Sequence, residues 1–120
     1  MYKTRKRPVR EHYLRFLALA QTISTPTGNA EPVDLLSQKL LEVIALRHNQ
    51  GEAMTVTDAM SISKIASPAT LHRKLDQLRE AGLIEQTFNG DNRRTKYLVP
   101  TKLADQYFCN LSKALVAASA

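Results

Sequence analysis

The stretch from Met54 to Thr101 decides the fold, and it reads MTVTDAMSISKIASPATLHRKLDQLREAGLIEQTFNGDNRRTKYLVPT. Caps, turn formers and apolar spacing along it predict a short helix, a turn, a longer helix and then a two-stranded hairpin. The pattern of the flanking segments is helical as well. The sequence therefore predicts a mostly helical fold with one small β-hairpin.

The first residues of the two helices mark where each of them begins. Thr55 and Asp58 have the T-x-x-D spacing of a capping box, which predicts a short helix that runs through roughly Ser63. The longer helix is expected to begin at Ser67-Pro68, because serine caps a helix start and proline at the first position loses no hydrogen bond. One side of this longer helix is apolar and carries Leu71, Leu75 and Leu78.

The hairpin that follows has cations at its tip. Two strand-like runs, Leu83–Phe88 and Thr95–Val99, are joined by the turn formers Asn89-Gly90-Asp91-Asn92. A basic tip can straddle a DNA backbone or place an arginine in a narrow minor groove. The alternative is a solvated charged turn that has no binding role. The candidate contact residues at or beside the tip are Asn92, Arg93, Arg94 and Lys96.

The outer face of the longer helix is the second candidate surface. Opposite the leucines, its first two turns present small or polar side chains, which are Ser67, Ala69, Thr70, His72 and Arg73. A helix that reads the major groove needs such residues near its N-terminus, where they approach base edges and phosphates. Arginine can bond guanine at two atoms, and threonine can bond a base or touch a thymine methyl group. An ordinary amphipathic helix also has a solvent-exposed polar face, so this face alone does not indicate DNA binding. The basic hairpin directly after the helix favours the DNA-binding interpretation.

The flanking segments form a frame of three further helices. Residues 11–24 have helical apolar spacing, Ser24–Glu31 is a linker of turn formers, and a core helix is expected from about Pro32 to His48. Pro100-Thr101 opens a last helix, 101–118. The two terminal helices carry apolar stripes, with Tyr13, Phe16 and Leu17 in the first and Leu103, Tyr107, Leu111 and Leu115 in the last. Exposed stripes of large side chains invite association, so the sequence predicts a two-fold symmetric homodimer that uses these residues as its interface.

The positive charge is concentrated at the N-terminus. The chain of 120 residues has a net charge of +6, and its first ten residues hold five Lys or Arg and no acid. The remaining 110 residues therefore carry a net charge of only +1. Residues 1–10 are interpreted either as a phosphate-binding arm or as a solvated, disordered terminus. Residues 11–120 are interpreted as a single domain whose DNA-binding core is 32–100.

Signals of catalysis and of cofactors are missing from the sequence. His12, His48 and His72 lie in different predicted elements without metal-ligand spacing, and no phosphate loop or nucleophile elbow occurs. The only cysteine, Cys109, rules out an intrachain disulfide and is expected to be a buried, inert thiol. No apolar run approaches the roughly 20 residues that span a bilayer. We expect a cytoplasmic protein that is not an enzyme and has neither a catalytic site, a metal nor a cofactor.

The segments VTDAM, SPATLHRKLDQLREAGLIEQ and DNRRTKYLVPT resemble the winged helix-turn-helix of the multiple-antibiotic-resistance-regulator (MarR) family of bacterial transcription factors. The resemblance includes Leu78, Gly82 and Leu83 at the end of the recognition helix, and Asp91 with Arg93 in the wing. It implies that Arg93 enters the minor groove and that Thr70 and Arg73 read the major groove. It also implies dimerisation through the first and last helices, 11–24 and 101–118. Val99-Pro100-Thr101 departs from the usual entry to the last helix by one residue.

These observations favour a sequence-specific regulator that binds double-stranded DNA as a homodimer. Two alternatives stay open. The first is a DNA-binding protein of plasmid or phage replication or partition, and the second is a winged helix used only for protein contacts. The chain is shorter than typical members of the family, so no small-molecule effector is carried over from it, although an effector is compatible with the sequence. No membrane partner is expected.

Overall fold

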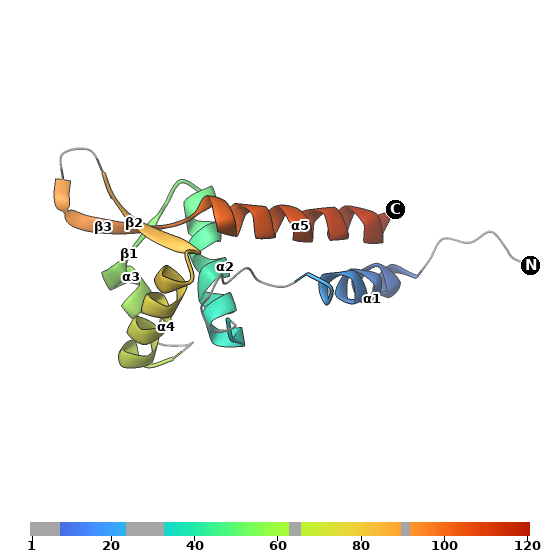
Figure 1. The fold of residues 1–120 in the computed structure, drawn as a ribbon, viewed down its shortest axis with the longest axis horizontal. Helices are drawn as coiled ribbons and strands as arrows, with labels where there is room; N and C mark the ends of the chain where they lie inside the picture. The colour runs from blue at the N-terminus through green and yellow to red at the C-terminus, as the bar shows by residue number, and fades with distance from the viewer. Residues whose placement is uncertain (1–7, 24–32, 63–65, 90–91) are drawn as a thin grey trace, which may run out of the picture. The chain divides into compact units, whose positions relative to one another are not determined.

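The structure, a computed structural model, describes residues 8–23, 33–62, 66–89 and 92–120, with the backbone alone for 89, 92 and 93 (Figure 1). The chain divides into two compact units. The central unit is Thr25–Asp105, and the terminal unit combines Met1–Ser24 with Gln106–Ala120. The expected basic arm lies mostly outside the described residues, but Val9 and Arg10 already belong to a helix.

Three helices of the central unit begin at capping side chains. They are α2 (Leu35–Asn49), α3 (Val56–Met60) and α4 (Pro68–Glu80). The capping box of α3 is confirmed, because Thr55 Oγ1 accepts from the Asp58 amide at 3.0 Å and Asp58 accepts from the Thr55 amide at 3.1 Å. The expected start of α2 at Pro32 is wrong. The carboxylate of Asp34 accepts from the Ser37 amide at 2.8 Å, which makes Asp34 the cap and Leu35 the first helical residue.

Two glycines end helices in the left-handed conformation. Gly51 follows α2 with φ +79° and Gly82 follows α4 with φ +78°, a region that side chains with a Cβ disfavour. After α4, the Leu83 amide donates to the Leu78 carbonyl at 3.0 Å and the Gly82 amide to the Arg79 carbonyl at 3.0 Å. This pair of bonds is a Schellman motif, which turns the chain directly from α4 into the hairpin.

The sheet has three strands, one more than the sequence predicts. They are β1 (Met54–Thr55), β2 (Ile84–Asn89) and β3 (Asn92–Pro100), in the antiparallel order β1-β3-β2. β1 pairs with Leu98 and Tyr97, and its two residues are too few to show a strand pattern. Asn92 pairs with Asn89 whereas Lys96 pairs with Phe88, so residues 93–95 form a bulge on β3.

The core of the central unit lies where α2, α4 and the sheet meet. The predicted face of α4 is confirmed, because Leu71, Leu75 and Leu78 are at most 3% exposed. The other large apolar side chains of this unit that are fully or nearly fully buried are Leu40, Leu41, Ile44, Met54, Leu83, Ile84 and Leu98. The Thr101 hydroxyl donates to the Gly82 carbonyl at 2.6 Å and accepts from the Ala104 amide at 3.3 Å. It thereby joins the end of α4 to the start of α5 (Lys102–Ser119).

The terminal unit contains α1 (Val9–Ala20) and most of α5. α1 begins two residues before the expected position and ends four before it, and none of its residues is buried. The buried positions of α5 in this unit are the small residues Ala114 and Ala118. Arg15 donates to the Ala118 carbonyl at 3.2 Å, and His12 Nδ1 lies 3.2 Å from the same oxygen. A cationic side chain at the last turn of α5 satisfies a carbonyl that has no partner within the helix.

Candidate nucleic-acid interface

The first turn of α4 holds two hydroxyl groups in a fixed relation. The Ser67 hydroxyl accepts from the Thr70 amide at 3.3 Å and donates to the Thr70 hydroxyl oxygen at 3.0 Å. Thr70 is half-buried, whereas Ser67, Ala69, His72 and Arg73 are exposed. The structure thus brings the five residues expected on the outer face of this helix to one end of α4, where four of them face solvent.

Farther along α4, three charged or titratable side chains form a row. His72 Nδ1 lies 3.5 Å from an Asp76 carboxylate oxygen, and Asp76 lies 3.9 Å from the Arg79 guanidinium. The spacings are i to i+4 and i to i+3, which place neighbouring side chains on one helix surface. Arg79 was not among the residues expected from sequence, although this spacing from Asp76 could have identified it.

A separate ion pair fastens α4 to the beginning of α2. The Lys74 ammonium group bonds to the Asp34 carboxylate, which also caps α2. The Lys74 side chain is 14% exposed and that of Asp34 is 49% exposed. The bond from Lys74, followed by the bond from the Ser37 amide, lowers the pKa of Asp34 from 3.8 to about 2. No local sequence signal connects these residues, since they are 40 positions apart.

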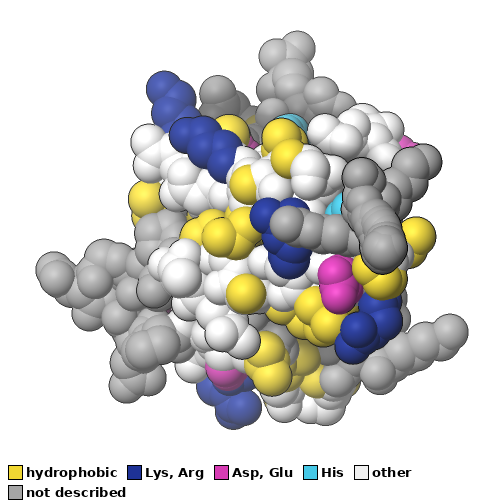
Figure 2. All heavy atoms as spheres, turned by 90° about the vertical axis from the view of Figure 1, so that its right-hand side faces the viewer, with side chains coloured by type: hydrophobic (Ala, Val, Ile, Leu, Met, Phe, Trp, Pro, Cys, Tyr) yellow, Lys and Arg dark blue, Asp and Glu magenta, His cyan; other side chains and the backbone are white. Residues whose placement is uncertain are grey.

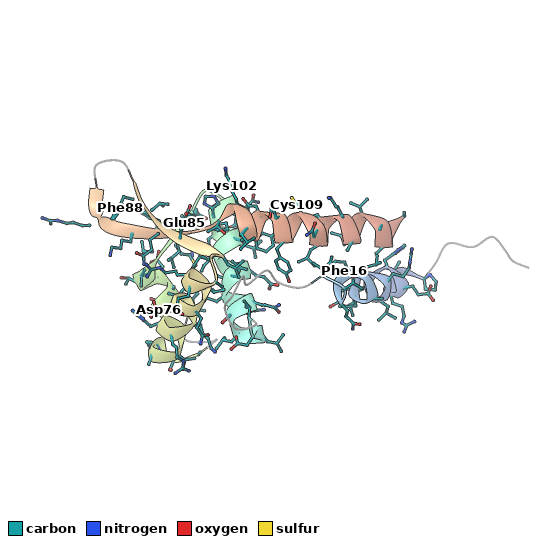
Figure 3. All side chains as sticks on the ribbon, viewed as in Figure 1. Phe16, Asp76, Glu85, Phe88, Lys102 and Cys109 are labelled. Atoms are coloured by element: carbon teal, nitrogen blue, oxygen red, sulfur yellow. The ribbon has the colours of Figure 1, made fainter. Side chains whose placement is uncertain are left out.

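The hairpin of β2 and β3 carries the second group of expected residues. Arg94 and Lys96 are exposed on β3, while the side chains of Asn92 and Arg93 lie outside the described part of the chain. Figure 3 places Phe88 near the tip of the hairpin, and this side chain is 43% exposed. Side chains alternate between the two faces along a regular strand. The bulge at residues 93–95 interrupts this alternation between Asn92 and Lys96 on β3.

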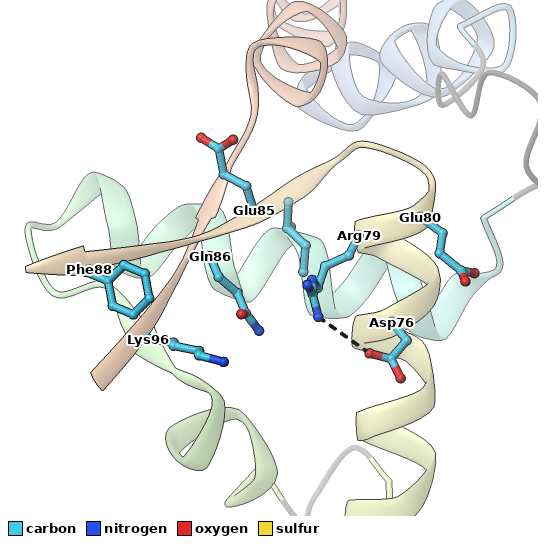
Figure 4. A pocket seen from close by; sticks show the side chains of 8 residues that line it. Asp76, Arg79, Glu80, Glu85, Gln86, Phe88 and Lys96 are labelled. Carbon is cyan, nitrogen blue, oxygen red and sulfur yellow. Dashed lines mark ion pairs between the residues drawn. The ribbon is translucent and has the colours of Figure 1, made fainter. Parts of the chain in front are cut away.

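A hollow lies between α4 and the hairpin within the central unit. Its larger part has a volume of about 730 Å³ and is lined by Asp76, Arg79, Glu80, Ile84, Glu85, Gln86, Phe88 and Lys96. In the close view, Gln86 and Lys96 extend from the hairpin toward α4, and Arg79 extends from α4 toward the hairpin (Figure 4). The hollow therefore lies between the helix and the hairpin that carry the two candidate contact surfaces.

The described residues show neither a metal-binding group nor a membrane-spanning helix. No group of three or more His, Cys, Asp or Glu side chains that could hold a metal ion occurs there. None of the helices in the described ranges has the length and apolar character that crossing a membrane requires. Cys109 is exposed, so the expectation of a buried thiol is wrong (Figure 3). It faces outward because the buried positions of α5 are Ala104, Ala114 and Ala118.

Comparison with known proteins supports the architecture. No family model and no curated protein sequence matches the chain. The solved structure of the heme sensor protein PefR from Streptococcus agalactiae, in complex with heme, is similar with a TM-score of 0.53 and 17% sequence identity. The match covers 94% of this chain and 76% of the PefR chain. This chain has a winged-helix fold.

The fold assigns a place to each candidate residue. α3 and α4 are the helix-turn-helix, α4 is the helix in the recognition position, and the hairpin of β2 and β3 is the wing. The mostly helical class and the small hairpin predicted from sequence are confirmed, with β1 as an additional short strand. The residues expected at the DNA surface all belong to α4 with its cap, or to the wing.

Proposed function

We propose that the protein is a transcriptional regulator of the MarR type that binds specific double-stranded DNA sequences as a homodimer. The observation that carries the proposal is the pairing, within one compact unit, of the exposed polar start of α4 with the exposed cations of the wing. Ala69 and Arg73 are open to solvent on the helix, and Arg94 and Lys96 are open to solvent on β3. A helix for the major groove and a basic wing for the flanking backbone are the two parts that winged helices use on DNA.

The hydrogen bonds at the start of α4 support a reading role for Thr70. Its hydroxyl oxygen accepts from Ser67, so its own hydrogen can be donated to an acceptor on a base edge. Arg73 is exposed one turn farther along and can bond both major-groove acceptors of a guanine. His72 and Asn92 complete the proposed contact set on the helix and the wing. Arg93 is proposed as the minor-groove residue of the wing from the family resemblance alone.

The exposed apolar side chains of the terminal unit support the homodimer. Tyr13 is 62% exposed, Leu17 is 37% exposed and Leu115 is 56% exposed, while Phe16, Tyr107 and Leu111 are half-buried. Hydrophobic side chains also reach the surface among Lys and Arg on the face drawn in Figure 2. Leu103 is half-buried in the central unit, where it lies 3.8 Å from the position that a Gly82 Cβ would occupy. Pairing of two chains would remove apolar surface from water and place two copies of α4 about one DNA turn apart.

The proposal includes no effector and no membrane partner, and it places the protein in the cytoplasm. Heme is a ligand of PefR, and the described residues of this chain give no reason to transfer it. A replication or partition role would use the same DNA surface. Selected binding sites that cluster at a replication origin rather than at promoters would indicate that role. A winged helix used only for protein contacts would select no DNA sequence.

The test is selection of binding sites from random duplexes by the full-length chain, followed by fluorescence anisotropy at several salt concentrations. We expect a near-palindromic site and an affinity that falls steeply with salt. Arg73→Ala should relax the preference at a definite base pair, whereas Arg93→Ala should weaken all duplexes and lower the salt slope by about one. Lys113→Ala, an exposed lysine of the terminal unit, is the control for loss of one charge. Absence of any selected sequence would contradict the proposal.

A further inference from the structure

The hollow between α4 and the wing consists of two adjoining parts with common walls. The larger part measures about 730 Å³ and the smaller about 370 Å³. Among the described residues, four side chains line both parts, and they are Asp76, Arg79, Gln86 and Lys96. They come from α4, β2 and β3, so the recognition helix and both strands of the wing contribute to one concave surface.

The larger part of the hollow is lined, among the described residues, by two cations and three carboxylates, which are Arg79, Lys96, Asp76, Glu80 and Glu85. Arg79 and Lys96 are the two cations that line both parts. Among the described residues Lys96 has no ion pair, whereas the Asp76 carboxylate is shared between Arg79 and His72. The close view shows Glu85 on the far side of the hairpin and Glu80 directed away from the wing (Figure 4). Arg79 and Lys96 therefore extend into the hollow, whereas Glu80 and Glu85 line it with their carboxylate ends directed away from these two cations (Figure 4).

We propose that Arg79 and Lys96 together bind one phosphate of the DNA backbone in this hollow, with Asp76 as a positioning residue for Arg79. The inference rests on the proposed DNA-binding function. In DNA the sugar-phosphate backbone is the ridge that separates a major groove from the adjacent minor groove. A protein that places α4 in one groove and its wing in the next must accept that ridge between them, where the hollow lies.

The chemistry of the four shared side chains suits a phosphodiester. The Arg79 guanidinium has five N–H donors, so it can face Asp76 with one edge and a phosphate oxygen with another. Lys96 supplies a point charge, and the Gln86 amide supplies a neutral donor from the neighbouring strand. A base edge would need acceptors and donors in a plane, whereas the donors here come from the three elements α4, β2 and β3.

Salt dependence gives the first test. Because the two cations share one phosphate, Arg79→Ala/Lys96→Ala should lower the salt slope by about one rather than two, and weaken binding roughly tenfold or more. The effects of the single variants should not add. Lys102→Ala/Lys113→Ala, which removes two exposed lysines of α5, should leave both the affinity and the slope nearly unchanged. A slope change of two with additive single effects would overturn the shared phosphate.

The role of Asp76 has its own readout. Asp76→Asn removes a negative charge, which by itself should tighten DNA binding. When Asp76→Asn is the single change, this gain in affinity should be cancelled or reversed, because Arg79 loses its positioning partner. In the Arg79→Ala background only the gain should remain. Equal tightening in both backgrounds would show that Asp76 does not act through Arg79.

Neutral methylphosphonate substitutions in the selected duplex, one phosphate at a time, give the decisive test. In the wild type, one phosphate per half-site between the two contacted grooves should be needed for tight binding. In Arg79→Ala/Lys96→Ala the same substitution should have no effect on affinity. Substitution at the other sensitive phosphates should still weaken binding. An unchanged pattern of sensitive phosphates would overturn this inference and leave the proposed function standing. Failure of the wild type to select any DNA would instead contradict the proposed function.

Discussion

The central and terminal units use their apolar residues in opposite ways. In the central unit Leu71, Leu78 and Leu98 are fully buried, and each of its helices α2, α3 and α4 has a side-chain cap. In the terminal unit α1 buries no residue and its first residue follows Pro8, which makes no side-chain cap. The central unit therefore has a hydrophobic core that is formed within a single chain. The terminal unit leaves large apolar groups in water, which is the reason to expect a partner there.

The largest effect should come from the core of the central unit. Leu71→Ala removes a fully buried side chain and leaves a cavity, so the free energy of unfolding should fall by about 2–5 kcal/mol. Urea denaturation at two protein concentrations would measure the loss. The loss should be the same at both concentrations, because this core lies within one chain. A loss that disappears at high protein concentration would mean that the central unit also depends on association.

The second effect should be confined to association of the terminal units. Leu115→Glu places a charge on an exposed leucine of α5, and we expect the dimer dissociation constant to rise roughly tenfold or more. Sedimentation velocity across a concentration series would measure it. The matched control is Leu46→Glu, because Leu46 is similarly exposed at 61% but belongs to α2 of the central unit. A wild-type chain that is monomeric at micromolar concentration would contradict the expectation that the terminal unit needs a partner and the central unit does not.

The same contrast explains how much of the fold the sequence could predict. The capping box at Thr55 and the cap at Ser67 are local signals, and the structure confirms both of them. The start of α2 was misplaced because Asp34 lies only two residues after Pro32, and proline is also common in a first helical turn. β1 was missed because its two residues are fixed by β3, which lies far away in the sequence.

The candidate site was predictable to a similar extent. The polar face of α4 follows from its leucine spacing, and the cations of β3 follow from the turn before them. The bulge at 93–95 and the hollow that joins Arg79 to Lys96 depend on the pairing of strands and on the packing of α4 beside β2. Neither has a local sequence pattern. The Lys74–Asp34 pair was missed for the same reason, since it joins two elements that are distant along the chain.

A smaller effect should follow from removing one helix cap of the central unit. Thr55→Ala deletes the hydroxyl that accepts from the Asp58 amide, and we expect a loss of about 1 kcal/mol in the free energy of unfolding. Thr57→Ala is the control, because Thr57 is an exposed residue of the same helix and is not its cap. α1 has no equivalent bond to remove, which is part of the contrast between the units. Equal losses in the two variants would show that the cap contributes nothing.

The smallest effect should be a pH dependence at Asp34. Its pKa is lowered to about 2 by Lys74 and by the Ser37 amide, so its ionised form is favoured in the folded chain. A lowered pKa stabilises the fold above the unfolded value near 3.8, and this contribution is lost as the pH falls toward 2. Because the Asp34 side chain is about half exposed, water screens the pair and the contribution should stay below about 1 kcal/mol.

Asp34→Asn isolates this charge, because asparagine can still cap α2 but cannot pair with Lys74. Urea denaturation between pH 7 and pH 2 should show the wild type more stable than the variant down to about pH 4, with the difference vanishing toward pH 2. Lys74→Met should show the same convergence, since it removes the other partner. A difference that persists unchanged at pH 2 would mean that Asp34 stabilises α2 by its cap geometry and not by its charge. The charge pair between Lys74 and Asp34 would then contribute nothing measurable to the attachment of α4 to α2.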